Sequence, residues 1–558
     1  MISYKTMDAN EAVSTVSYKF SEICGIYPIT PASPMAEEVD RMSARGCVNC
    51  FGDKVQVVEM QSEAGAIAMV HGALQSGILS TTFTASQGLL LMIPSLYKMA
   101  GEMLPAVVHV ASRSLSTHAL SIFGDHQDVY ACRGTGVCML SSSSVQEAYY
   151  MASIAHLSAI KSSLPFINFF DGFRTSHEID KVKLMDMERV CSLIDNDALE
   201  NFRNRAMNSA RPNSRGLAEN DDIYFQHTEV RNINYIKCVD YVKEYMDKLN
   251  EINETDIKLF NYYGAKNASY VIVAMGSVCE TIKDTIDYLN SNGGKYGLVV
   301  VHLFRPFSIV DLKNVIPESV KKIAVLDRSK DASGSGEALY LDVVNALKDM
   351  KVKIYGGRYG LSSKNTTPAD IKAVYDFLES DKTFSNFTIG IIDDVTNLSL
   401  DTSKVFKIPN CELEMLIYGY GSDGMVSTSK DLLKIIGANT DKCVQGYFQY
   451  DSKKSGGVTR SHIRIDNDII RKTYYVDNPN VLVISKDSYI YKYDILDNVC
   501  DGGIVLLNTN LSSNDLIKSL PDRVKYLLAS KHLRFYTIDA NGIVNKIGLR
   551  NKISTCME

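Results

Sequence analysis

The chain has 558 residues, of which 45% are hydrophobic and 22% charged, and its formal net charge is −6. This size and balance indicate a globular protein of several domains. Because the net charge is small and acidic, and because no run of about 18 apolar residues occurs, we expect no nucleic-acid partner and no membrane span.

Strands and helices alternate in the chain as far as about residue 180. Apolar runs predict strands at 54–58, 81–85, 106–111 and 165–170. Residues 62–74 predict a helix whose inward positions are filled by alanine and glycine. Such alternation is typical of a mainly parallel sheet covered by helices on both faces.

The middle of the chain changes character and then returns to the α/β pattern. Residues 192–235 are rich in Asn, Arg and Asp and contain Pro212 and Gly216, which predicts a linker or a wrapping arm. After a charged helix, predicted at 239–252, further strands are predicted at 270–275, 297–303 and 322–326, with a helix at 281–289.

A third α/β pattern occupies the last part of the chain. It comprises predicted strands at 413–418, 481–484 and 503–508 and a helix at 425–436. We therefore expect an α/β protein of three domains, at 1–256, 257–405 and 406–558, with the polar arm belonging to the first.

The twelve cysteines are scattered, so we expect no disulfide scaffold. Cys47 and Cys50 form one C-x-x-C pair, which could be half of a metal site or a redox pair. Because no second pair lies at a useful spacing, we interpret them as free thiols. The N-terminal residues resemble neither a secretory signal nor a transit peptide, so we expect a cytoplasmic protein.

Two motifs near the N-terminus could carry chemistry. Pro28 and Pro31 flank Thr30 and fix the backbone of a turn that presents its hydroxyl, although a purely structural loop explains the same pattern. Glu63 is expected in the first turn of the 62–74 helix. It either complements the helix dipole or presses a desolvated carboxylate against an organic cofactor.

Two further candidates lie beyond the next predicted strands. Arg113 follows a buried strand, where a guanidinium can meet a ligand carboxylate or form a structural ion pair. The polar segment 123–128 could be catalytic, but we interpret it as a hydrogen-bonded turn.

A glycine-rich turn opens the third region. Gly419, Gly421 and Gly424 form a G-x-G-x-x-G between a predicted strand and helix, and Asp441 lies about 20 residues on, as in a dinucleotide-binding fold. Taken alone, this motif is a weak indication of NAD binding.

Long motifs spread over almost the whole chain resemble those of pyruvate:ferredoxin oxidoreductases. They include YPITPASPMAE, VVEMQSEAGA, TFTASQGLLLMIPSLYKMAGEMLP, ALSIFGDHQDV, FFDGFRTSHEI, IYFQ, HLFRPFS, GYGSDGMVSTSK, QGYFQYDSKKSGGVTRSHIR and FYTIDANGIVNKIGLRNKI. The resemblance implies a thiamine pyrimidine-side domain, a second domain like the C-terminal domain of transketolase, and a third domain associated with coenzyme A.

The resemblance also implies roles for individual residues. Glu63 resembles the glutamate that hydrogen-bonds the aminopyrimidine ring of thiamine diphosphate, and Pro28 is also expected at the cofactor site. Thr30 and Arg113 resemble the residues that hold the 2-oxoacid, which we expect to be pyruvate. A coenzyme A site is expected from Gly421 together with the segment that contains Lys453, Lys454, Ser455, Gly456 and Arg460, where glycine amides and cations favour an anion.

The sequence lacks two further features of that family. We find no G-D-G motif followed by an Asn, which would hold the diphosphate through Mg²⁺, and no cysteine set for iron–sulfur clusters. We therefore expect half of a thiamine site, completed by a second chain that passes electrons to ferredoxin or flavodoxin, within a homodimer or larger assembly. The alternatives are a non-catalytic scaffold or remnant and, less favoured, a sulfite-reductase-like fusion.

Overall fold

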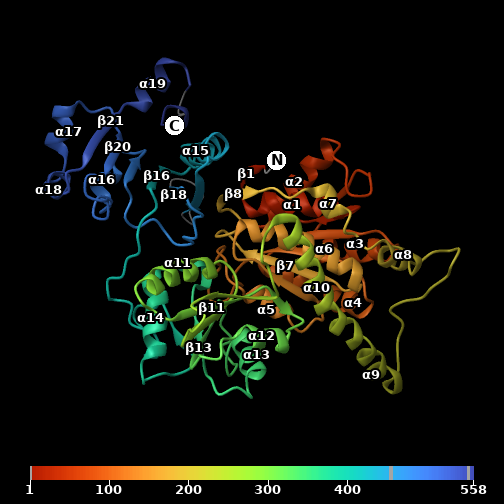
Figure 1. The fold of residues 1–558 in the computed structure, drawn as a ribbon. Helices are drawn as coiled ribbons and strands as arrows, with labels where there is room; N and C mark the ends of the chain where they lie inside the picture. The colour runs from red at the N-terminus through yellow and green to blue at the C-terminus, as the bar shows by residue number, and fades with distance from the viewer. Residues whose placement is uncertain (1–2, 451–456, 550–552, 558) are drawn as a thin grey trace. The chain divides into compact units, whose positions relative to one another are not determined.

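The computed structural model describes residues 3–450, 457–549 and 553–557, which form an α/β protein with three sheets (Figure 1). The chain divides into two compact units. The larger comprises residues 8–176 and 185–407, and the smaller comprises residues 1–7, 177–184 and 408–558. The first and second sheets belong to the larger unit and the third sheet to the smaller. No helix in the described part of the chain has the length and apolarity needed to cross a membrane.

The first sheet has the strand order β12-β6-β7-β5-β4-β2-β3. In chain order its strands are β2 (Ile23–Ile26), β3 (Gln56–Glu59), β4 (Ser80–Thr84), β5 (Val107–Ser112), β6 (Cys138–Ser141), β7 (Phe166–Asp171) and β12 (Leu303–Arg305). All neighbours pair in parallel except β12, which is antiparallel to β6. The strands predicted at 81–85, 106–111 and 165–170 are β4, β5 and β7, each displaced by one residue.

Helices connect the parallel strands of this sheet, because a parallel crossover has to pass over a face. They are α1 (Ala9–Phe20), α2 (Ser33–Ala44), α3 (Glu63–Gln75), α4 (Ser86–Gly101), α5 (Gln127–Cys132) and α6 (Val145–Ser162). Local capping fixes where several begin: the side chains of Asp8, Ser62 and Ser144 accept hydrogen bonds from amides in the first turns of α1, α3 and α6.

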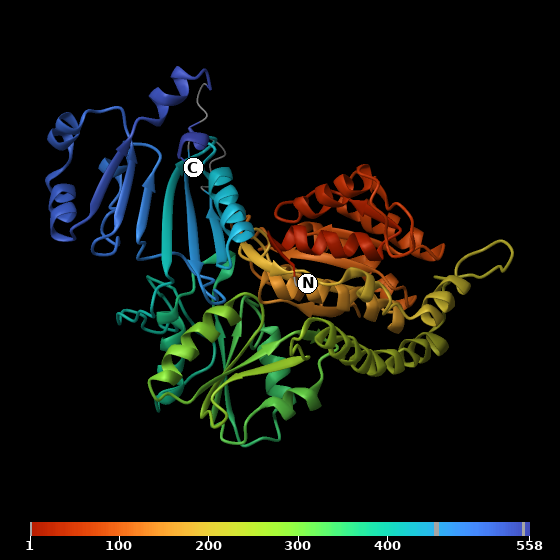
Figure 2. The same ribbon diagram turned by 45° about the horizontal axis from the view of Figure 1, so that its top comes forward.

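The second sheet has the order β15-β14-β13-β10-β11-β9, and only β9 runs antiparallel. Its strands are β9 (Phe260–Gly264), β10 (Tyr270–Ala274), β11 (Tyr296–Val301), β13 (Lys322–Asp327), β14 (Lys353–Arg358) and β15 (Phe387–Thr388). Figure 2 shows the sheet between helices on both faces; they are α11 (Val278–Ser291), α12 (Ile309–Val315), α13 (Ala338–Ala346) and α14 (Pro368–Glu379), with a short 3-10 turn η1 (Leu361–Ser363).

The polar arm contains more regular structure than the sequence predicted. It carries α7 (Met187–Cys191), α8 (Asn196–Asn204), α9 (Asp221–Val230) and α10 (Asn232–Asn253). Asp195 caps α8 through the amide of Ala198, so residues that looked like linker start a helix instead. The helix α10 packs against α6, whereas α9 buries none of its residues.

The third sheet has the order β1-β8-β17-β18-β16-β19-β20-β21. Its strands are β1 (Tyr4–Met7), β8 (Ile179–Lys183), β16 (Leu413–Tyr420), β17 (Cys443–Gln449), β18 (Val458–Asp466), β19 (Val481–Ile484), β20 (Ile504–Asn508) and β21 (Arg534–Ile538). Its helices are α15 (Met425–Asn439), α16 (Tyr489–Lys492), α17 (Ser513–Ser519), α18 (Asp522–Ser530), α19 (Ala540–Lys546) and α20 (Ser554–Met557).

Two strands of the third sheet come from a part of the chain that the sequence analysis placed in the first domain. β8 pairs with β17 in antiparallel orientation, and β1 pairs with β8 at the edge. The strand β8 lies more than 250 residues before its partner β17, and β1 lies more than 170 residues before β8, so no local pattern could show this. The first domain is therefore not continuous from residue 1 to residue 256.

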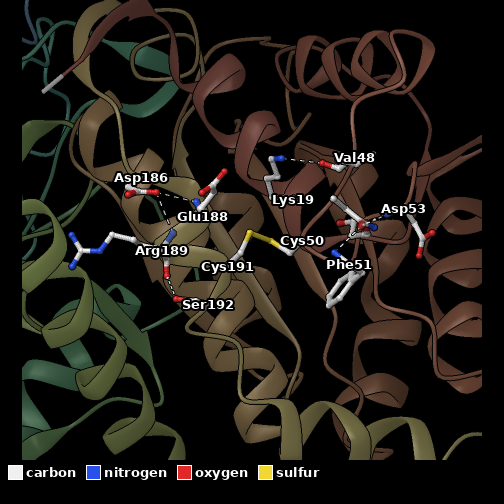
Figure 3. Close-up of a disulfide and its surroundings, with 12 residues drawn as sticks. Lys19, Val48, Cys50, Phe51, Asp53, Asp186, Glu188, Arg189, Cys191 and Ser192 are labelled. Atoms are coloured by element: carbon white, nitrogen blue, oxygen red, sulfur yellow. Dashed lines mark hydrogen bonds between the residues drawn. A yellow bond between two sulfur atoms is a disulfide. The ribbon is translucent and has the colours of Figure 1, made fainter. Parts of the chain in front are cut away.

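A disulfide joins Cys50 to Cys191, across 141 residues of sequence (Figure 3). The interpretation of Cys50 as a free thiol is therefore wrong, whereas Cys47 remains free. The turn that ends the arm's first helix, α7, brings Cys191 beside the loop after α2, and the Cα atoms are 5.6 Å apart.

Candidate active site

The candidate residues gather where the parallel strands of the first sheet end. Thr30 lies in the loop after β2, Glu63 begins the helix after β3, and Arg113 directly follows β5. Because these three strands are parallel, their carboxyl ends meet at one edge of the sheet. This edge is where open α/β sheets bind their ligands.

Arg113 is held in a fixed position and keeps donor capacity. Its side chain is only 8% exposed. Its Nη1 donates to the carbonyl of Thr30 at 2.8 Å and its Nε donates to the carbonyl of Ser121 at 3.3 Å. Among the described residues, none accepts a hydrogen bond from its Nη2. Burial lowers the pKa of Arg113 and the nearby Asp128 opposes that shift, so an oriented cation with a free N–H group remains.

The loop that carries Thr30 and Pro28 is open. Both residues are exposed, while the following Pro31 is buried. The hydroxyl of Thr30 makes no hydrogen bond within the described structure, and its carbonyl accepts from Arg113. The structure therefore brings Thr30 and Arg113 together, as two groups with free donors on one side of the sheet edge.

Glu63 presents a desolvated carboxylate at the same edge. It is 8% exposed and is the first residue of α3, which Ser62 caps through the amide of Gly65. A Cβ on Gly88 would meet both Glu63 Oε1 and Thr84 Oγ1 at 2.7 Å, so both oxygens converge on the bare backbone of Gly88. No described residue bonds the Glu63 carboxylate, and Thr84 Oγ1 is buried without a partner.

No hydrogen bond or ion pair joins Glu63 to Thr30 or to Arg113 in the described part of the chain. The sequence therefore predicted residues that share a sheet edge, and a ligand would have to connect them. Buried polar groups in native proteins are almost always paired, so the unpaired oxygens near Gly88 are suited to receive a ligand.

Asp128 organises the backbone around Arg113. Its carboxylate accepts hydrogen bonds from the amides of Ser86 at 2.8 Å and Arg113 at 2.9 Å, and from the hydroxyl of Ser112 at 2.6 Å. Burial raises the pKa of Asp128 to about 6, although these hydrogen bonds favour the charged form. The segment 123–128 is thus a hydrogen-bonded turn that supports the edge.

A second buried carboxylate was missed by the sequence analysis. Asp171, at the end of β7, accepts from His126 Nε2 at 2.6 Å, from Arg328 Nη1 at 2.6 Å, and from the amide and hydroxyl of Ser277. Burial alone would raise the pKa of Asp171, but Arg328 and His126 hold it well below its usual range. Arg328 and Ser277 follow strands of the second sheet, so Asp171 ties the ends of two sheets together.

The glycine-rich turn of the third sheet has a different structure. Gly421 lines a cavity of about 380 Å³ with the first turn of α15 and with Thr459. The carboxylate of Asp423 is used within the turn: it accepts from the amides of Tyr420 at 2.6 Å and Met425 at 2.9 Å and from the hydroxyl of Ser485 at 2.7 Å.

The structure describes only some of the other residues expected at a coenzyme A site. Lys453, Lys454, Ser455 and Gly456 lie outside the described residues. Arg460 does not line the cavity; it alternates with Thr459 along β18, and its guanidinium lies 5.4 Å from the ring of Tyr418. Only Gly421 of this set therefore contributes to the described cavity.

The arrangement of strands argues against a dinucleotide fold. In such a fold the strand after the first helix pairs directly with the first strand. Here β18 lies between β16 and β17 and is antiparallel to both. Asp441 precedes β17 and is exposed at its amino end, away from the edge where a ribose would be bound.

No group of three or more His, Cys, Asp or Glu side chains suited to a metal ion occurs among residues 3–450, 457–549 and 553–557. The site as described thus consists of an oriented cation, an open hydroxyl and a buried carboxylate. Together these can bind a carboxylate-bearing substrate beside a polar organic cofactor.

Three family models match successive parts of the chain. The thiamine diphosphate-binding domain of pyruvate flavodoxin/ferredoxin oxidoreductase matches residues 15–247, core domain II of pyruvate:ferredoxin oxidoreductase matches residues 268–371, and a further pyruvate ferredoxin/flavodoxin oxidoreductase domain matches residues 414–557. A solved 2-oxoglutarate:ferredoxin oxidoreductase from Magnetococcus marinus covers 67% of this chain and 65% of its own at 19% identity and a TM-score of 0.48, which is too low to carry a conclusion.

Curated relatives align along nearly the whole chain. The pyruvate-flavodoxin oxidoreductase of Enterobacter agglomerans is 48% identical over 558 residues, which is 99% of this chain and 48% of the relative. The pyruvate:ferredoxin oxidoreductase of Moorella thermoacetica is 48% identical over 557 residues, with the same coverage. The chain spans about half the length of these relatives, and it belongs to the pyruvate:ferredoxin/flavodoxin oxidoreductase family.

Proposed function

We propose that this chain forms the substrate-binding half of an enzyme that oxidatively decarboxylates pyruvate to acetyl-coenzyme A and carbon dioxide. The observation that carries the proposal is the set of three side chains, Thr30, Glu63 and Arg113, which lie at one sheet edge with polar groups that no described residue uses. Groups that served only the fold would be paired internally.

The proposed substrate contacts follow from the free donors. Arg113 would bind the carboxylate of the 2-oxoacid, since its Nη2 is free and its remaining nitrogens are already fixed by two carbonyls. The open hydroxyl of Thr30 would donate to the substrate carboxylate or keto oxygen. Their juxtaposition would orient the acid with its keto carbon toward the edge that holds Glu63.

The surroundings of Glu63 fit the pyrimidine ring of thiamine diphosphate. Gly88 lets the Glu63 carboxylate and the Thr84 hydroxyl approach its bare backbone, and both unpaired groups offer polar partners to the ring. When bound, this cofactor supplies the nucleophilic carbon and the electron sink for decarboxylation. Glu63 would share a proton with a ring nitrogen, a task suited to a desolvated carboxyl group.

The remaining parts of the reaction need partners. We propose that a second chain supplies the diphosphate half-site with its Mg²⁺ and the iron–sulfur clusters that reduce ferredoxin or flavodoxin. Coenzyme A would accept the acyl group, and the cavity beside Gly421 would receive part of it. Its volume of about 380 Å³ suits one end of such a molecule.

We also propose that the protein forms a homodimer. The arm supports this, because α9 and the start of α10 expose a run of large apolar side chains. These are Ile223, Tyr224, Phe225, Val230, Ile233 and Ile236, which are 42–71% exposed. A contiguous apolar surface of this kind is typical of protein interfaces.

The proposal is tested by calorimetric titration of thiamine diphosphate and Mg²⁺ into the chain, alone and co-purified with a second half. We expect tight binding only in the assembled sample, together with pyruvate-dependent dye reduction that is lost in Glu63→Gln. The control is Glu188→Gln, an exposed acidic residue in the first turn of α7. Absence of binding in both samples would leave the scaffold or remnant interpretation.

A further inference from the structure

We propose that the turn Ser362–Ser363, which belongs to the second sheet, positions Arg113 for the oxoacid by holding the loop 114–124. The inference rests on the proposed function only in assigning Arg113 to the substrate. Ser362 and Ser363 are positioning residues in this proposal, because neither is placed against a substrate or cofactor. Two independent lines of contact support it.

The turn and the loop are joined by backbone and side-chain hydrogen bonds. The Ser363 amide donates to the Gly124 carbonyl at 2.8 Å, and the Gly124 amide donates to Ser363 Oγ at 2.9 Å. The Ser362 amide donates to Asp125 Oδ2 at 3.1 Å, and the hydroxyls of Ser362 and Ser121 bond each other. With the Ser363 hydroxyl, which donates to the Gly124 carbonyl at 3.4 Å, five hydrogen bonds join the turn to residues 121–125 at one end of the loop.

The same end of the loop holds the guanidinium. The Ser121 carbonyl accepts from Arg113 Nε at 3.3 Å and from Ser114 Oγ at 3.1 Å. The Ser114 amide donates to the Phe123 carbonyl at 3.0 Å, which closes the loop on itself. A shift of Ser121 would therefore move the acceptor that sets the direction of the Arg113 side chain.

A second line of contact runs through two glycines. A Cβ on Gly124 would meet the carbonyl oxygen of Gly172 at 2.4 Å, so these backbones touch directly. A Cβ on Gly172 would in turn meet the Ser112 carbonyl oxygen at 2.5 Å and Pro31 Cγ at 2.9 Å. A displacement of Ser363 would therefore move Gly124 and Gly172, and through them Ser112 and Pro31, which are the neighbours of Arg113 and Thr30.

The turn has a strained backbone conformation that its surroundings maintain. Ser362 and Ser363 both adopt positive φ angles, of 53° and 56°. Residues other than glycine pay conformational free energy in this region, and such residues persist where their surroundings fix them, often at functional sites. Arg328, which binds Asp171, also donates from Nε to the Gly360 carbonyl at 2.9 Å and so anchors the start of the turn.

The first residues of the loop are held by Ser86, whose hydroxyl donates to the Ser114 carbonyl at 2.6 Å, and by Gln127, whose side chain accepts from the Leu115 amide at 3.3 Å, whereas its middle is exposed. Residues 116–120 are exposed, with Leu120 68% exposed. Within the described structure, the attachment of the loop to the second sheet consists of its bonds to Ser362 and Ser363. Removing those bonds should loosen the exposed part of the loop without disturbing the buried strands on either side.

Hydrogen–deuterium exchange on the full chain tests the physical link. In Ser362→Ala/Ser363→Ala we expect peptides covering 114–124 to exchange about tenfold faster, the effect of losing one to two hydrogen bonds, while β7 stays unchanged. The control is Ser291→Ala, an exposed serine whose hydroxyl bonds only the Tyr288 carbonyl and the side chain of the neighbouring Asn292. Unchanged exchange at 114–124 would overturn the proposal.

Steady-state kinetics of the assembled enzyme test the consequence for the substrate. We expect the double variant to raise the KM for pyruvate about tenfold, with kcat changed less than about twofold and thiamine diphosphate affinity unchanged. The variant Ser362→Ala/Ser363→Asn should have a KM for pyruvate close to that of the unmodified enzyme. Asn tolerates a positive φ, and its amide oxygen can accept a hydrogen bond from the Gly124 amide. If the two serines only stabilised the fold, the double variant would be less stable but would not show a raised KM with an almost unchanged kcat.

The variant Arg113→Gln separates the two hypotheses. If it raises the KM but the serine variants do not, the positioning proposal fails and the proposed function stands. If it leaves the KM unchanged, Arg113 does not bind the oxoacid and both assignments fail.

Discussion

Two turns at the ends of parallel strands look equally suited to a ligand in the sequence, but the structure separates them. At the edge of the first sheet, Glu63 and Arg113 keep polar atoms that no described residue uses. In the turn after β16, Asp423 accepts three hydrogen bonds from within its own neighbourhood. The first edge keeps polar atoms without partners, as is expected of a ligand site, whereas the acidic residue of the second turn stabilises the turn itself.

The difference shows that a sequence motif and a binding site are recognised by different observations. The G-x-G-x-x-G spacing reports backbone geometry, since Gly424 has a φ of 85° and Gly419 lies against Thr459. Unpaired and buried polar atoms instead report a missing partner. The comparison predicts that residues at the first edge affect activity and that Asp423 affects stability.

The largest expected effect is that of Glu63→Gln on turnover. We expect pyruvate-dependent dye reduction by the assembled enzyme to fall by about 10²–10⁴-fold, because the proton partner of the cofactor ring is removed. The free energy of unfolding of the chain should stay the same or rise, since a buried unpaired carboxylate is replaced by a neutral group. If the variant instead lost stability and kept its activity, Glu63 would serve the fold and not the reaction.

Arg113→Lys should have the next largest effect. A lysine cannot reproduce the fork of donors that binds Thr30, Ser121 and a substrate carboxylate together. We expect kcat/KM for pyruvate to fall by about 10–100-fold, mainly through KM, as measured by initial rates. Arg133→Lys, at an exposed helix end, is the control and should change neither parameter.

Asp423→Ala tests the expectation that the turn after β16 contributes to stability. It leaves the amides of Tyr420 and Met425 without their acceptor, so we expect the third sheet to lose about 1–3 kcal/mol of stability in urea denaturation. Binding of thiamine diphosphate by the assembled enzyme should not change. If that binding weakens while stability is unaffected, Asp423 belongs to a site after all.

The smallest expected effect concerns a buried histidine pair beneath the first edge. His109 Nε2 and His156 Nε2 lie 3.1 Å apart, and Asn168 bonds the other nitrogen of His109. Burial lowers the pKa of His156 to about 3 and, with His156 beside it, lowers that of His109 well below its usual range. The unfolded chain therefore binds more protons between about pH 6.5 and 3, and stability is lost as the pH falls through that window.

The variant His156→Gln isolates this contribution, because a glutamine can still accept from His109 but cannot be protonated. We expect the difference in unfolding free energy between the variant and the unmodified chain to change by at most about 1.4 kcal/mol per pH unit between pH 6.5 and 3. Aspartates with raised pKa values are common to both proteins, so they cancel in the difference. Parallel curves would mean that the pair is not buried as described.

Much of the fold followed from local patterns. The strands β4, β5 and β7 and the helix α3 were predicted to within about a residue, because buried parallel strands are continuous apolar runs. The strands β1 and β8 were not, since only the pairing of β8 with β17, and of β1 with β8, assigns them to the third sheet. The disulfide between Cys50 and Cys191 was missed for the same reason, that distant segments meet only in the fold.

The site was predictable only in part. Thr30, Glu63 and Arg113 were predicted from long motifs; the structure places them at the ends of parallel strands, and their roles stay predictions. Asp171 and Arg328 were missed, although each directly ends a buried apolar strand, because their meeting depends on how two sheets are joined. Residues within one chain segment can be singled out from the sequence, but contacts between distant segments cannot.

The small strand β12 bears on how a gene for such a protein can be divided. Leu303–Arg305 belongs by sequence to the second domain but completes the first sheet by pairing with β6. A break in the coding sequence between the two domains would leave β6 with an open row of backbone donors and acceptors, a surface that favours aggregation. We therefore expect workable divisions of this protein to fall after the last strand of the second sheet, so that the first two sheets are translated as one polypeptide.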